Sequence, residues 1–328
     1  MSTDEPRSFG VVAIGRNEGE RLKRCLESVS NAAQIIYVDS GSTDGSLQWA
    51  RLTGVDSLAL DLSLPFTAAR ARNVGFRRLR TIAPDLKFIQ FIDGDCELNR
   101  DWPDTALSFL GSHEHVCAVL GRRRERYPER SVYNLMCDQE WNVPLGEVKA
   151  CGGDVMMRID ALEAAGGYRD DLIAGEEPEL CVRLRAAGWK IWRLDQEMTL
   201  HDASLVRFSQ WWRRQMRSGY AFVQGAQLHG RSPDRHWVWE SRRALIWGLG
   251  FPLVLISATF VSGWWGALLS LVYPLQILRR MPAMHGAWRT RFNLAFFEQL
   301  SRFAEMMGEL RFFRDQYLGR HRKLIEYK

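Results

Sequence analysis

Short apolar runs alternate with amphipathic stretches over residues 8–200. Runs rich in β-branched and aromatic residues predict strands over 9–14, 35–38, 57–60, 87–92 and 116–120. Helical spacing between these runs predicts helices such as 18–30 and 66–81. The alternation indicates an α/β domain with a mostly parallel sheet flanked by helices. Ligands of such sheets bind beyond the carboxyl ends of the strands, so the residues that follow each strand are the candidates for a site.

The character of the chain changes after residue 203. Residues 203–243 contain eight arginines and two acids, and residues 244–278 contain no charged residue. As a single helix this run would reach about 52 Å, against a hydrocarbon core of about 30 Å. A Gly-Trp-Trp-Gly cluster at 263–266 divides the run, and an arginine pair flanks each end. We expect a membrane hairpin or re-entrant pair with both ends cytoplasmic. A single span and a buried pair of core helices are the alternatives.

Apolar residues recur at helical spacing over residues 292–313, which predicts an amphipathic helix. Such a helix lies on a membrane or packs on the α/β domain, and periodicity does not separate the two. We therefore expect two domains. Residues 1–225 form the α/β domain, and residues 226–328 form a helical, membrane-associated region.

Composition adds little beyond this. Hydrophobic residues make up 46% of the 328 residues and charged residues 25%, which excludes a disordered or collagen-like chain. A net charge of +5 permits anionic partners without identifying one. The six cysteines lack zinc-site spacing, and we expect them to be reduced and buried in a cytosolic protein. The N-terminal residues do not have the pattern of a secretory signal.

Polar segments follow the first two predicted strands. Arg16 and Glu18 lie in a Gly-Arg-Asn-Glu segment that does not match the dinucleotide-binding glycine pattern. This segment is either a ligand site or a polar turn. Asp39 ends the second strand, where a carboxylate can accept hydrogen bonds from a base or from ribose hydroxyls. The following Gly/Ser/Asp run is typical of a turn, and Asp44 is better interpreted as a helix cap.

Arg72 and Asn73 lie in a predicted helix, where they could grip a phosphate or a base, or form a solvated basic face. Asp93 and Asp95 flank a glycine at the end of the fourth strand. Two carboxylates so close repel each other unless a cation lies between them, and their oxygens suit Mg²⁺ or Mn²⁺. An acidic turn is the alternative.

Glu176 and Glu177 begin a predicted helix that has Pro178 in its first turn. Acids at this position usually stabilise the helix N-terminus. The helix dipole lowers the pKa of such a carboxylate and a like-charged neighbour raises it, so the sequence leaves the sign of the shift open. A single histidine such as His201 is more often a structural residue than a ligand.

Together and in this order, these segments resemble a family 2 glycosyltransferase of the GT-A fold over residues 9–202. The motifs that carry the resemblance are the Arg-Asn-Glu turn, VDSGSTDGS, ARNVG, FIDGD and GEEPEL. The resemblance implies a Rossmann-like α/β fold. It also implies an inverting enzyme that uses a nucleotide-diphosphate sugar together with Mg²⁺ or Mn²⁺.

The resemblance assigns roles to individual residues. Nucleotide-sugar binding falls to Arg16, Glu18, Asp39, Arg72, Asn73 and Asp93. Asp95 becomes the more direct metal ligand, with Asp93 and His201 as further contacts. Glu177 takes the place of the catalytic base, where aspartate is commoner, with Glu176 as its neighbour and rival. Gly153 and Asp154 fall on the acceptor side.

The segment Gln210-Trp211-Trp212-Arg213 only partly matches the Q-x-x-R-W pattern of processive synthases, because Arg214 stands in the tryptophan place. We therefore expect a non-processive enzyme on the cytosolic face of the cytoplasmic membrane. A lipid-linked or envelope glycan is the expected acceptor, and a UDP-sugar is the favoured donor.

Two other functions remain open, a membrane-bound pseudoenzyme or scaffold, and a nucleotidyltransferase that acts on a sugar phosphate. Nucleic acid is not an expected partner. The Arg/Trp segment precedes the membrane-like run, where basic residues favour anionic lipid.

Overall fold

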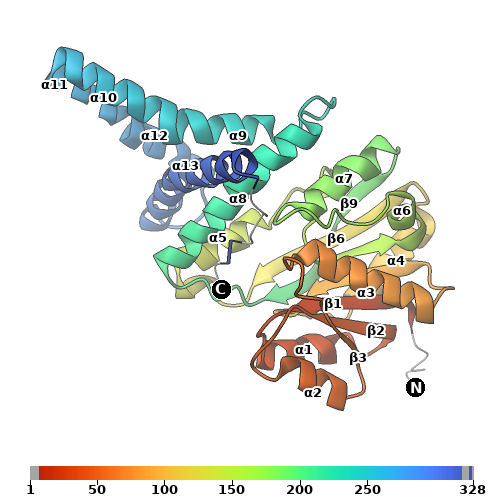
Figure 1. Cartoon of the computed structure of the whole chain (residues 1–328). Coiled ribbons are helices and arrows are strands. Elements are labelled where there is room, and N and C mark those ends of the chain that lie inside the picture. The colour runs from red at the N-terminus through yellow and green to blue at the C-terminus, as the bar shows by residue number, and fades with distance from the viewer. Residues whose placement is uncertain (1–6, 320–324, 327–328) are drawn as a thin grey trace. The chain divides into compact units, whose positions relative to one another are not determined.

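A computed structural model describes residues 7–319 and 325–326 (Figure 1). The chain divides into two compact units. The first unit contains the described residues up to Tyr127 together with Cys137–Ala203, and the second contains Pro128–Met136 together with the described residues from Ser204 onward. The predicted boundary at residue 225 lies inside α8 (Phe208–His229), and the division into 1–225 and 226–328 stays a prediction.

The first unit is built on a nine-stranded sheet in the order β3-β2-β1-β4-β8-β6-β9-β5, with β7 also paired to β9. The strands are β1 (Arg7–Gly15), β2 (Ala32–Asp39), β3 (Asp56–Ala59), β4 (Phe88–Asp93), β5 (Cys96–Leu98), β6 (Val116–Glu125), β7 (Gly146–Val148), β8 (Val155–Arg158) and β9 (Lys190–His201). Neighbours are parallel from β3 to β4 and between β6 and β9. The pairings of β8, β5 and β7 are antiparallel. All five predicted strands are present, and the α/β class is confirmed.

Helices connect and cover these strands. They are α1 (Glu20–Ser28), α2 (Ser46–Leu52), α3 (Ala68–Ile82), α4 (Trp102–Ser112), α6 (Ile159–Ala164) and α7 (Glu176–Ala186). The predicted helices at 18–30 and 66–81 correspond to α1 and α3. Helix α3 packs on β1 and β2, and α4 packs on β6 and β9. A Cβ on Gly75 of α3 would collide with Val12 of β1, so only glycine permits this close approach.

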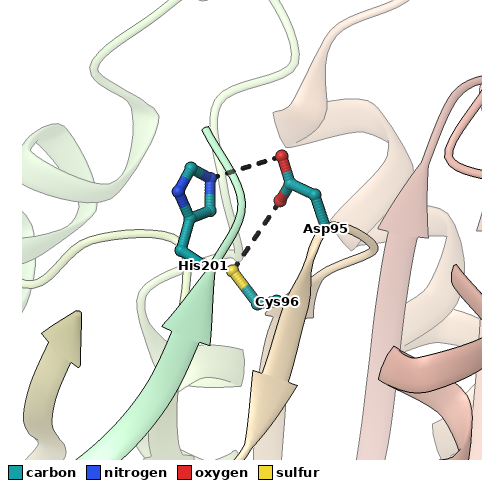
Figure 2. A group of neighbouring side chains, drawn as sticks. All are labelled: Asp95, Cys96 and His201. Atoms are coloured by element: carbon teal, nitrogen blue, oxygen red, sulfur yellow. Dashed lines mark hydrogen bonds and ion pairs between the residues drawn. The ribbon is translucent and has the colours of Figure 1, made fainter. Parts of the chain in front are cut away.

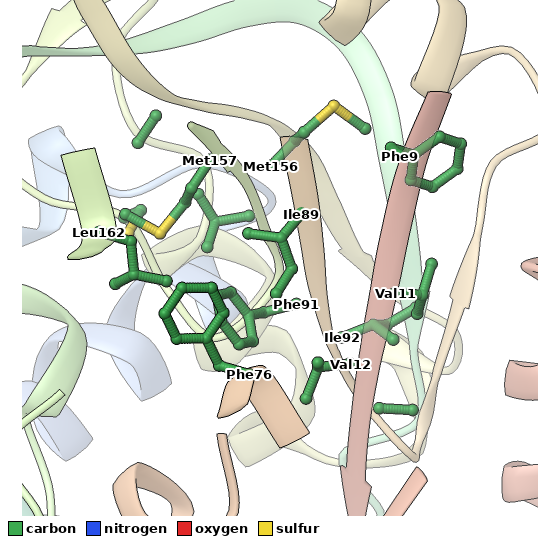
Figure 3. Packing of buried hydrophobic residues seen from close by; sticks show 14 of the residues in the cluster. Phe9, Val11, Val12, Phe76, Ile89, Phe91, Ile92, Met156, Met157 and Leu162 are labelled. Carbon is green, nitrogen blue, oxygen red and sulfur yellow. The ribbon is translucent and has the colours of Figure 1, made fainter. Parts of the chain in front are cut away.

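The core of the first unit lies between the sheet and its helices. Val11, Val12 and Ile92 come from the adjacent central strands β1 and β4, and they pack with Phe91 in the interior (Figure 3). These strands are covered on both faces, which explains why their sequences are continuous apolar runs rather than alternating ones. All six cysteine side chains are buried, as predicted.

Strand register aligns the ends of the central strands. Gly15 pairs with Asp39 between β1 and β2, and Ile14 pairs with Asp93 between β1 and β4. The polar residues that follow these three parallel strands therefore meet at one edge of the sheet.

The second unit is helical. Its elements are η1 (Pro128–Arg130), α5 (Val132–Glu140), α8, α9 (Val238–Leu245), the π-helical turn η2 (Ile246–Gly250), α10 (Phe251–Ser262), α11 (Trp264–Ala267), η3 (Leu268–Leu271), α12 (Val272–Arg280), η4 (Met281–Ala283) and α13 (Trp288–Tyr317). The last part of α5 belongs to the first unit. Among the described residues, one helix is long and apolar enough to cross a membrane, the continuous stretch Val238–Ser262 with a hydropathy of 2.1. Only 11% of its most apolar window is buried, so a buried pair of core helices does not describe this segment.

The apolar run folds back on itself at the predicted break. Gly263 has a φ of 58°, and α10 ends just before it. Gly266 packs so closely on the Ala258 backbone that a Cβ would collide with it. The Tyr273 hydroxyl donates to the Trp247 carbonyl at 2.9 Å. Residues 244–278 therefore form a helical hairpin, visible as α10, α11 and α12 in Figure 1.

Helix α13 contains the predicted helix at 292–313 and has an unusual burial pattern. Its apolar stripe is exposed, with Phe296 and Leu310 at 40% and 43%. Arg302, Glu305 and Glu309 are buried instead, and Arg302 forms an ion pair with Glu305 at 2.9 Å. Leu294 and Phe312 are buried on the same helix, so its covered side is mixed, whereas a helix on the surface of a water-soluble protein usually covers its apolar face and exposes its charged one.

The indole of Trp102 makes a buried hydrogen bond, which gives a prediction about stability. Its Nε1 donates to Gln90 Oε1 at 2.8 Å, and neither side chain is exposed. We expect Trp102→Phe to lower the free energy of unfolding by roughly 1–3 kcal/mol, because a buried acceptor loses its partner. Urea titration measures this. Trp49→Phe, at a half-buried tryptophan of α2, is the control, and equal losses in the two variants would contradict the prediction.

Candidate active site

The centre of the candidate site is the guanidinium of Arg72 on α3, which is 2% exposed. Its Nη1 lies 2.9 Å from Glu176 Oε1 and 2.9 Å from Glu177 Oε1. Its Nη2 lies 2.9 Å from Asp93 Oδ1. The structure thus brings together four predicted site residues from three separate segments. Arg72, predicted near the base or the diphosphate, serves here as the shared partner of three carboxylates.

The charge of this cluster explains the titration of its members. Burial acts to lower the pKa of Arg72, but Glu177, Asp93 and Glu176 raise it well above its usual value, so the guanidinium stays charged. Burial raises the pKa of Glu177 to about 7, and Glu176 adds to this rise while Arg72 opposes it. The sequence left open whether the pKa of this carboxylate is raised or lowered. In the structure the pKa of Glu177 is raised, because desolvation outweighs the opposing effect of the Arg72 charge.

Local structure at the start of α7 places the two glutamates. Gly175 precedes the helix with a φ of 78°, a left-handed conformation that favours glycine. The Glu176 side chain is 5% exposed, whereas the Glu177 side chain is 14% exposed. Of the two rivals, Glu177 is therefore the one with more access to a substrate.

Asp154 and Gly153 lie directly beside Asp93. The Asp154 carboxylate accepts hydrogen bonds from the Asp93 backbone N–H at 3.0 Å and from the Thr199 hydroxyl at 2.8 Å. A Cβ on Gly153 would lie 2.8 Å from Asp93 Oδ2. These two residues, predicted on the acceptor side, fix the position of Asp93 in this structure.

Arg123 belongs to the site but was missed in the sequence. Its Nη2 lies 3.5 Å from Asp93 Oδ2, and its Nε lies 3.5 Å from Asp154 Oδ2. Its guanidinium also lies over the Trp141 ring, 4.6 Å from the centroid. The available signal was the charged run at 122–125, which directly follows the apolar strand residues 116–120. A charged run that continues a buried strand indicates side chains held at the end of the sheet.

A second group consists of Asp95, Cys96 and His201, whose potential ligand atoms all lie within 4.8 Å of one another. Figure 2 shows the side chains of Asp95 and His201 facing each other, with His201 Nε2 3.3 Å from Asp95 Oδ2. The other ring nitrogen, Nδ1, lies 3.3 Å from Glu125 Oε2, a partner that the sequence did not suggest. Strand pairing between β5 and β9 sets Cys96 opposite His201.

The donors in this second group suit a divalent cation. Burial, together with Arg123, lowers the pKa of His201, which favours the neutral imidazole that a metal needs. The Glu125 carboxylate orients the ring from behind, as is usual for metal-binding histidines. Burial raises the pKa of the Cys96 thiol well above its usual value, which disfavours the thiolate form that binds metals. An Asp95 oxygen and a His201 nitrogen remain as the candidate ligands of a divalent cation.

The remaining predicted residues line the strand ends. The Asp39 carboxylate accepts hydrogen bonds from the Tyr37 hydroxyl at 2.8 Å and from the backbone N–H groups of Gly41 and Ser42 at 2.9 and 2.8 Å. The Arg16 guanidinium lies over the Phe66 ring, 4.6 Å from the centroid. Glu18 forms an ion pair with Arg21 at 2.7 Å.

Asn73 is turned toward another segment. Its amide nitrogen donates to the Tyr168 carbonyl and to Asp170 Oδ1, both at 2.7 Å. Its amide oxygen accepts from the Tyr168 backbone N–H at 3.0 Å. These contacts tie α3 to the chain that leads into α7, so Asn73 supports the glutamates rather than joining the carboxylates around Arg72.

One known protein family matches part of this chain. The sequence model of the family described as "Glycosyl transferase family 2" matches residues 11–149. These residues form a family 2 glycosyltransferase domain. Both the Arg72–Asp93 pair and Asp95 lie inside the matched segment, whereas Glu177 and His201 lie beyond it.

One curated relative is "Succinoglycan biosynthesis protein ExoA" of Rhizobium meliloti (strain 1021). The two sequences are 25% identical over 214 residues, which is 60% of this chain and 64% of the relative. The chain thus matches slightly less than two thirds of the relative's length.

Two solved structures share the fold. The mannosyltransferase PcManGT from Pyrobaculum calidifontis, in complex with GDP-Man and Mn²⁺, has a TM-score of 0.62 at 17% identity. The match covers 92% of this chain and 87% of that one. S. aureus TarS 1-349 in complex with UDP-GlcNAc has a TM-score of 0.51 at 14% identity, covering 95% and 92%. The predicted GT-A fold is confirmed.

The second group yields a prediction about metal binding. We expect His201→Ala and Asp95→Asn each to weaken Mn²⁺ binding by more than about tenfold, because each removes a ligand. Cys96→Ser leaves binding within about threefold of the unchanged protein, since a protonated thiol is not a ligand. Electron paramagnetic resonance of free Mn²⁺ measures all three. Loss of binding in Cys96→Ser with retention in His201→Ala would refute the assignment.

Proposed function

We propose that this chain transfers a sugar from a nucleotide-diphosphate sugar to a hydroxyl group of an acceptor, with inversion at the sugar C1. The observation that carries the proposal is Glu177. It is a partly exposed carboxylate with a pKa near 7, held by Arg72 beside Asp93 at the edge where the parallel strands end. A general base works best when its pKa is close to the operating pH.

In the proposed reaction, Glu177 accepts the proton of the acceptor hydroxyl, and the hydroxyl oxygen attacks C1 of the donor sugar. The bond from C1 to the diphosphate breaks as the new bond forms, so the configuration inverts. Arg72 holds Glu177 on the acceptor side and Asp93 on the donor side. Asp154 and Gly153 keep Asp93 in place from behind. Alignment of this kind supplies a large share of the rate in two-substrate reactions.

Asp95 and His201 would hold a divalent cation, Mg²⁺ or Mn²⁺. When bound, such an ion neutralises the negative charge of a diphosphate leaving group. Arg16, Glu18 and Asp39 form the proposed nucleoside side of the site. A ribose hydroxyl bound to Asp39 would displace the Ser42 hydroxyl, which now contacts Oδ1.

The donor class draws support from the two related structures. One was solved with GDP-Man and the other with UDP-GlcNAc. We favour a UDP-sugar for this chain.

The second unit supports a membrane location. We propose that the hairpin at 244–278 enters the cytoplasmic membrane from the cytosolic side, with Trp264 and Trp265 at its tip. Phe260 and Val261 near the tip are 91% and 81% exposed, which water would penalise and lipid would not. The exposed apolar stripe of α13 fits the membrane surface in the same way. The acceptor would then be a lipid-linked or envelope glycan, in keeping with the relative named for succinoglycan biosynthesis.

A change at Glu177 tests the proposed base. We expect Glu177→Gln to reduce transfer by about 10²–10⁴-fold and to leave nucleotide binding intact, because the amide accepts no proton. In the unchanged protein, kcat/KM should fall as the pH drops below about 7, where Glu177 becomes protonated. Radiolabelled sugar transfer to membrane extracts measures the rate, and calorimetry measures binding.

Glu176→Gln separates the two rivals. It removes the like-charged neighbour, so we expect transfer to persist and the acidic limb of the pH profile to shift to lower pH. Full transfer by Glu177→Gln together with inactive Glu176→Gln would reverse the assignment. Release of pyrophosphate from a sugar phosphate would indicate a nucleotidyltransferase instead.

The hairpin can be tested with charged substitutions. We expect Phe260→Asp with Val261→Asp to abolish flotation of the protein with liposomes, because two carboxylates near the tip oppose insertion at roughly 2.5–3.5 kcal/mol each. Leu52→Asp is the matched control, since Leu52 is 88% exposed on α2 of the other unit. Equal flotation of all three proteins would contradict the membrane proposal.

A further inference from the structure

A polar cavity of about 350 Å³ lies in the first unit, outside the cluster around Arg72. It is lined by Arg122, Arg124, Asn142, Arg193, Asp195, Gln196 and Glu197. Arg122 and Arg124 flank Arg123 in β6. Arg123 reaches Asp93 and is not among the lining residues, and none of the lining residues belongs to the cluster around Arg72.

The strand pairing beside the cavity is irregular. Leu120 of β6 pairs with Arg193 of β9, and Arg122 pairs with Glu197. Two steps along β6 therefore correspond to four steps along β9, and the extra residues bulge out of the sheet. Bulges of this kind re-aim side chains and often lie beside functional sites.

Arg193 forms the floor of the cavity. It is 3% exposed, its guanidinium donates a hydrogen bond to the Leu194 carbonyl, and among the described residues it forms no ion pair. Its Nε is buried without a hydrogen-bond partner. Burial lowers the pKa of Arg193 and the nearby charge of Arg122 lowers it further, while the carboxylates of Asp195 and Glu197 oppose this shift without forming an ion pair. A buried guanidinium without a carboxylate partner is costly, so its presence calls for an explanation.

The other two arginines are already neutralised. Arg122 Nη2 forms an ion pair with Asp138 at 2.8 Å. Arg124 binds Glu197 through two hydrogen bonds of 2.7 and 2.6 Å. The positive charge of the floor is therefore the one that a ligand would neutralise. Asp195 and Asn142 on the exposed side offer hydrogen-bond acceptors and donors of the kind that bind sugar hydroxyls.

We propose that this cavity binds an anionic saccharide, with its phosphate or carboxylate group on Arg193 and its hydroxyls on the polar rim. A volume of this size is at the lower end of small-ligand pockets and suits one sugar ring with one charged substituent. The inference does not depend on the role proposed for Glu177.

Saturation-transfer NMR on the full chain in detergent, with EDTA present, tests the proposal. The probes are glucose 6-phosphate, glucuronate, glucose and inorganic phosphate. We expect glucose 6-phosphate, glucuronate or both to bind. Neutral glucose should not bind. Comparison of the two shows whether phosphate or carboxylate is preferred, and competition by inorganic phosphate would show that the charged group provides most of the contact.

Arg193→Gln should weaken binding of the anionic sugars by at least about tenfold, because a hydrogen bond to a charged group is lost. Arg193→Lys keeps the charge and should retain part of the binding, which separates loss of charge from loss of folding. Arg51→Gln, at an exposed arginine of α2, is the control. Equal binding of glucose and the anionic sugars, no binding of either, or unchanged binding in Arg193→Gln would overturn the proposal.

Discussion

One buried guanidinium, that of Arg72, determines the arrangement of the candidate active site. Three carboxylates from β4 and α7 converge on it at 2.9 Å. A single positive charge does not neutralise three negative ones, and the excess, together with burial, raises the pKa of Glu177 to about 7. Without Arg72 the three groups would repel one another in a poorly solvated space. The contact with Arg72 thus holds the site together, while burial and the neighbouring carboxylates raise the pKa of its candidate base against the opposing charge of Arg72.

Much of the fold and of the cluster follows from the sequence, because parallel strands have continuous apolar runs and their carboxyl ends share an edge. Asp93 was predicted as a site residue from its position at the end of a strand, and Glu177 was predicted from the family resemblance. The contacts through which Arg72 joins them were not predictable, because the two residues lie 84 positions apart in the sequence and sequence spacing does not give their distance in the fold. Glu125 and Arg123 were missed because their roles depend on strand register. Asn73 was placed near the nucleotide, yet its amide binds the segment before α7.

In the second unit the sequence pattern predicted the helices but not which of their faces are buried. Periodicity predicted the α13 helix and composition predicted the break at Gly263, since both depend on local sequence. Which face of a helix is buried depends on tertiary packing, which local sequence does not determine. In α13 the charged residues Arg302 and Glu305 are buried while the apolar residue Phe296 is exposed, which the periodicity alone did not indicate. Burial of Glu309 against Ser241, at 2.9 Å, is part of the same packing.

Calorimetric titration of UDP, GDP, CDP and dTDP into the detergent-solubilised chain, first with Mn²⁺ or Mg²⁺ and then with EDTA, tests the central claim most directly. The account predicts that one nucleoside diphosphate binds with metal and that EDTA removes the binding. Folded protein that binds none of the four nucleotides with either ion would contradict a nucleotide-sugar site and favour a scaffold without enzymatic activity.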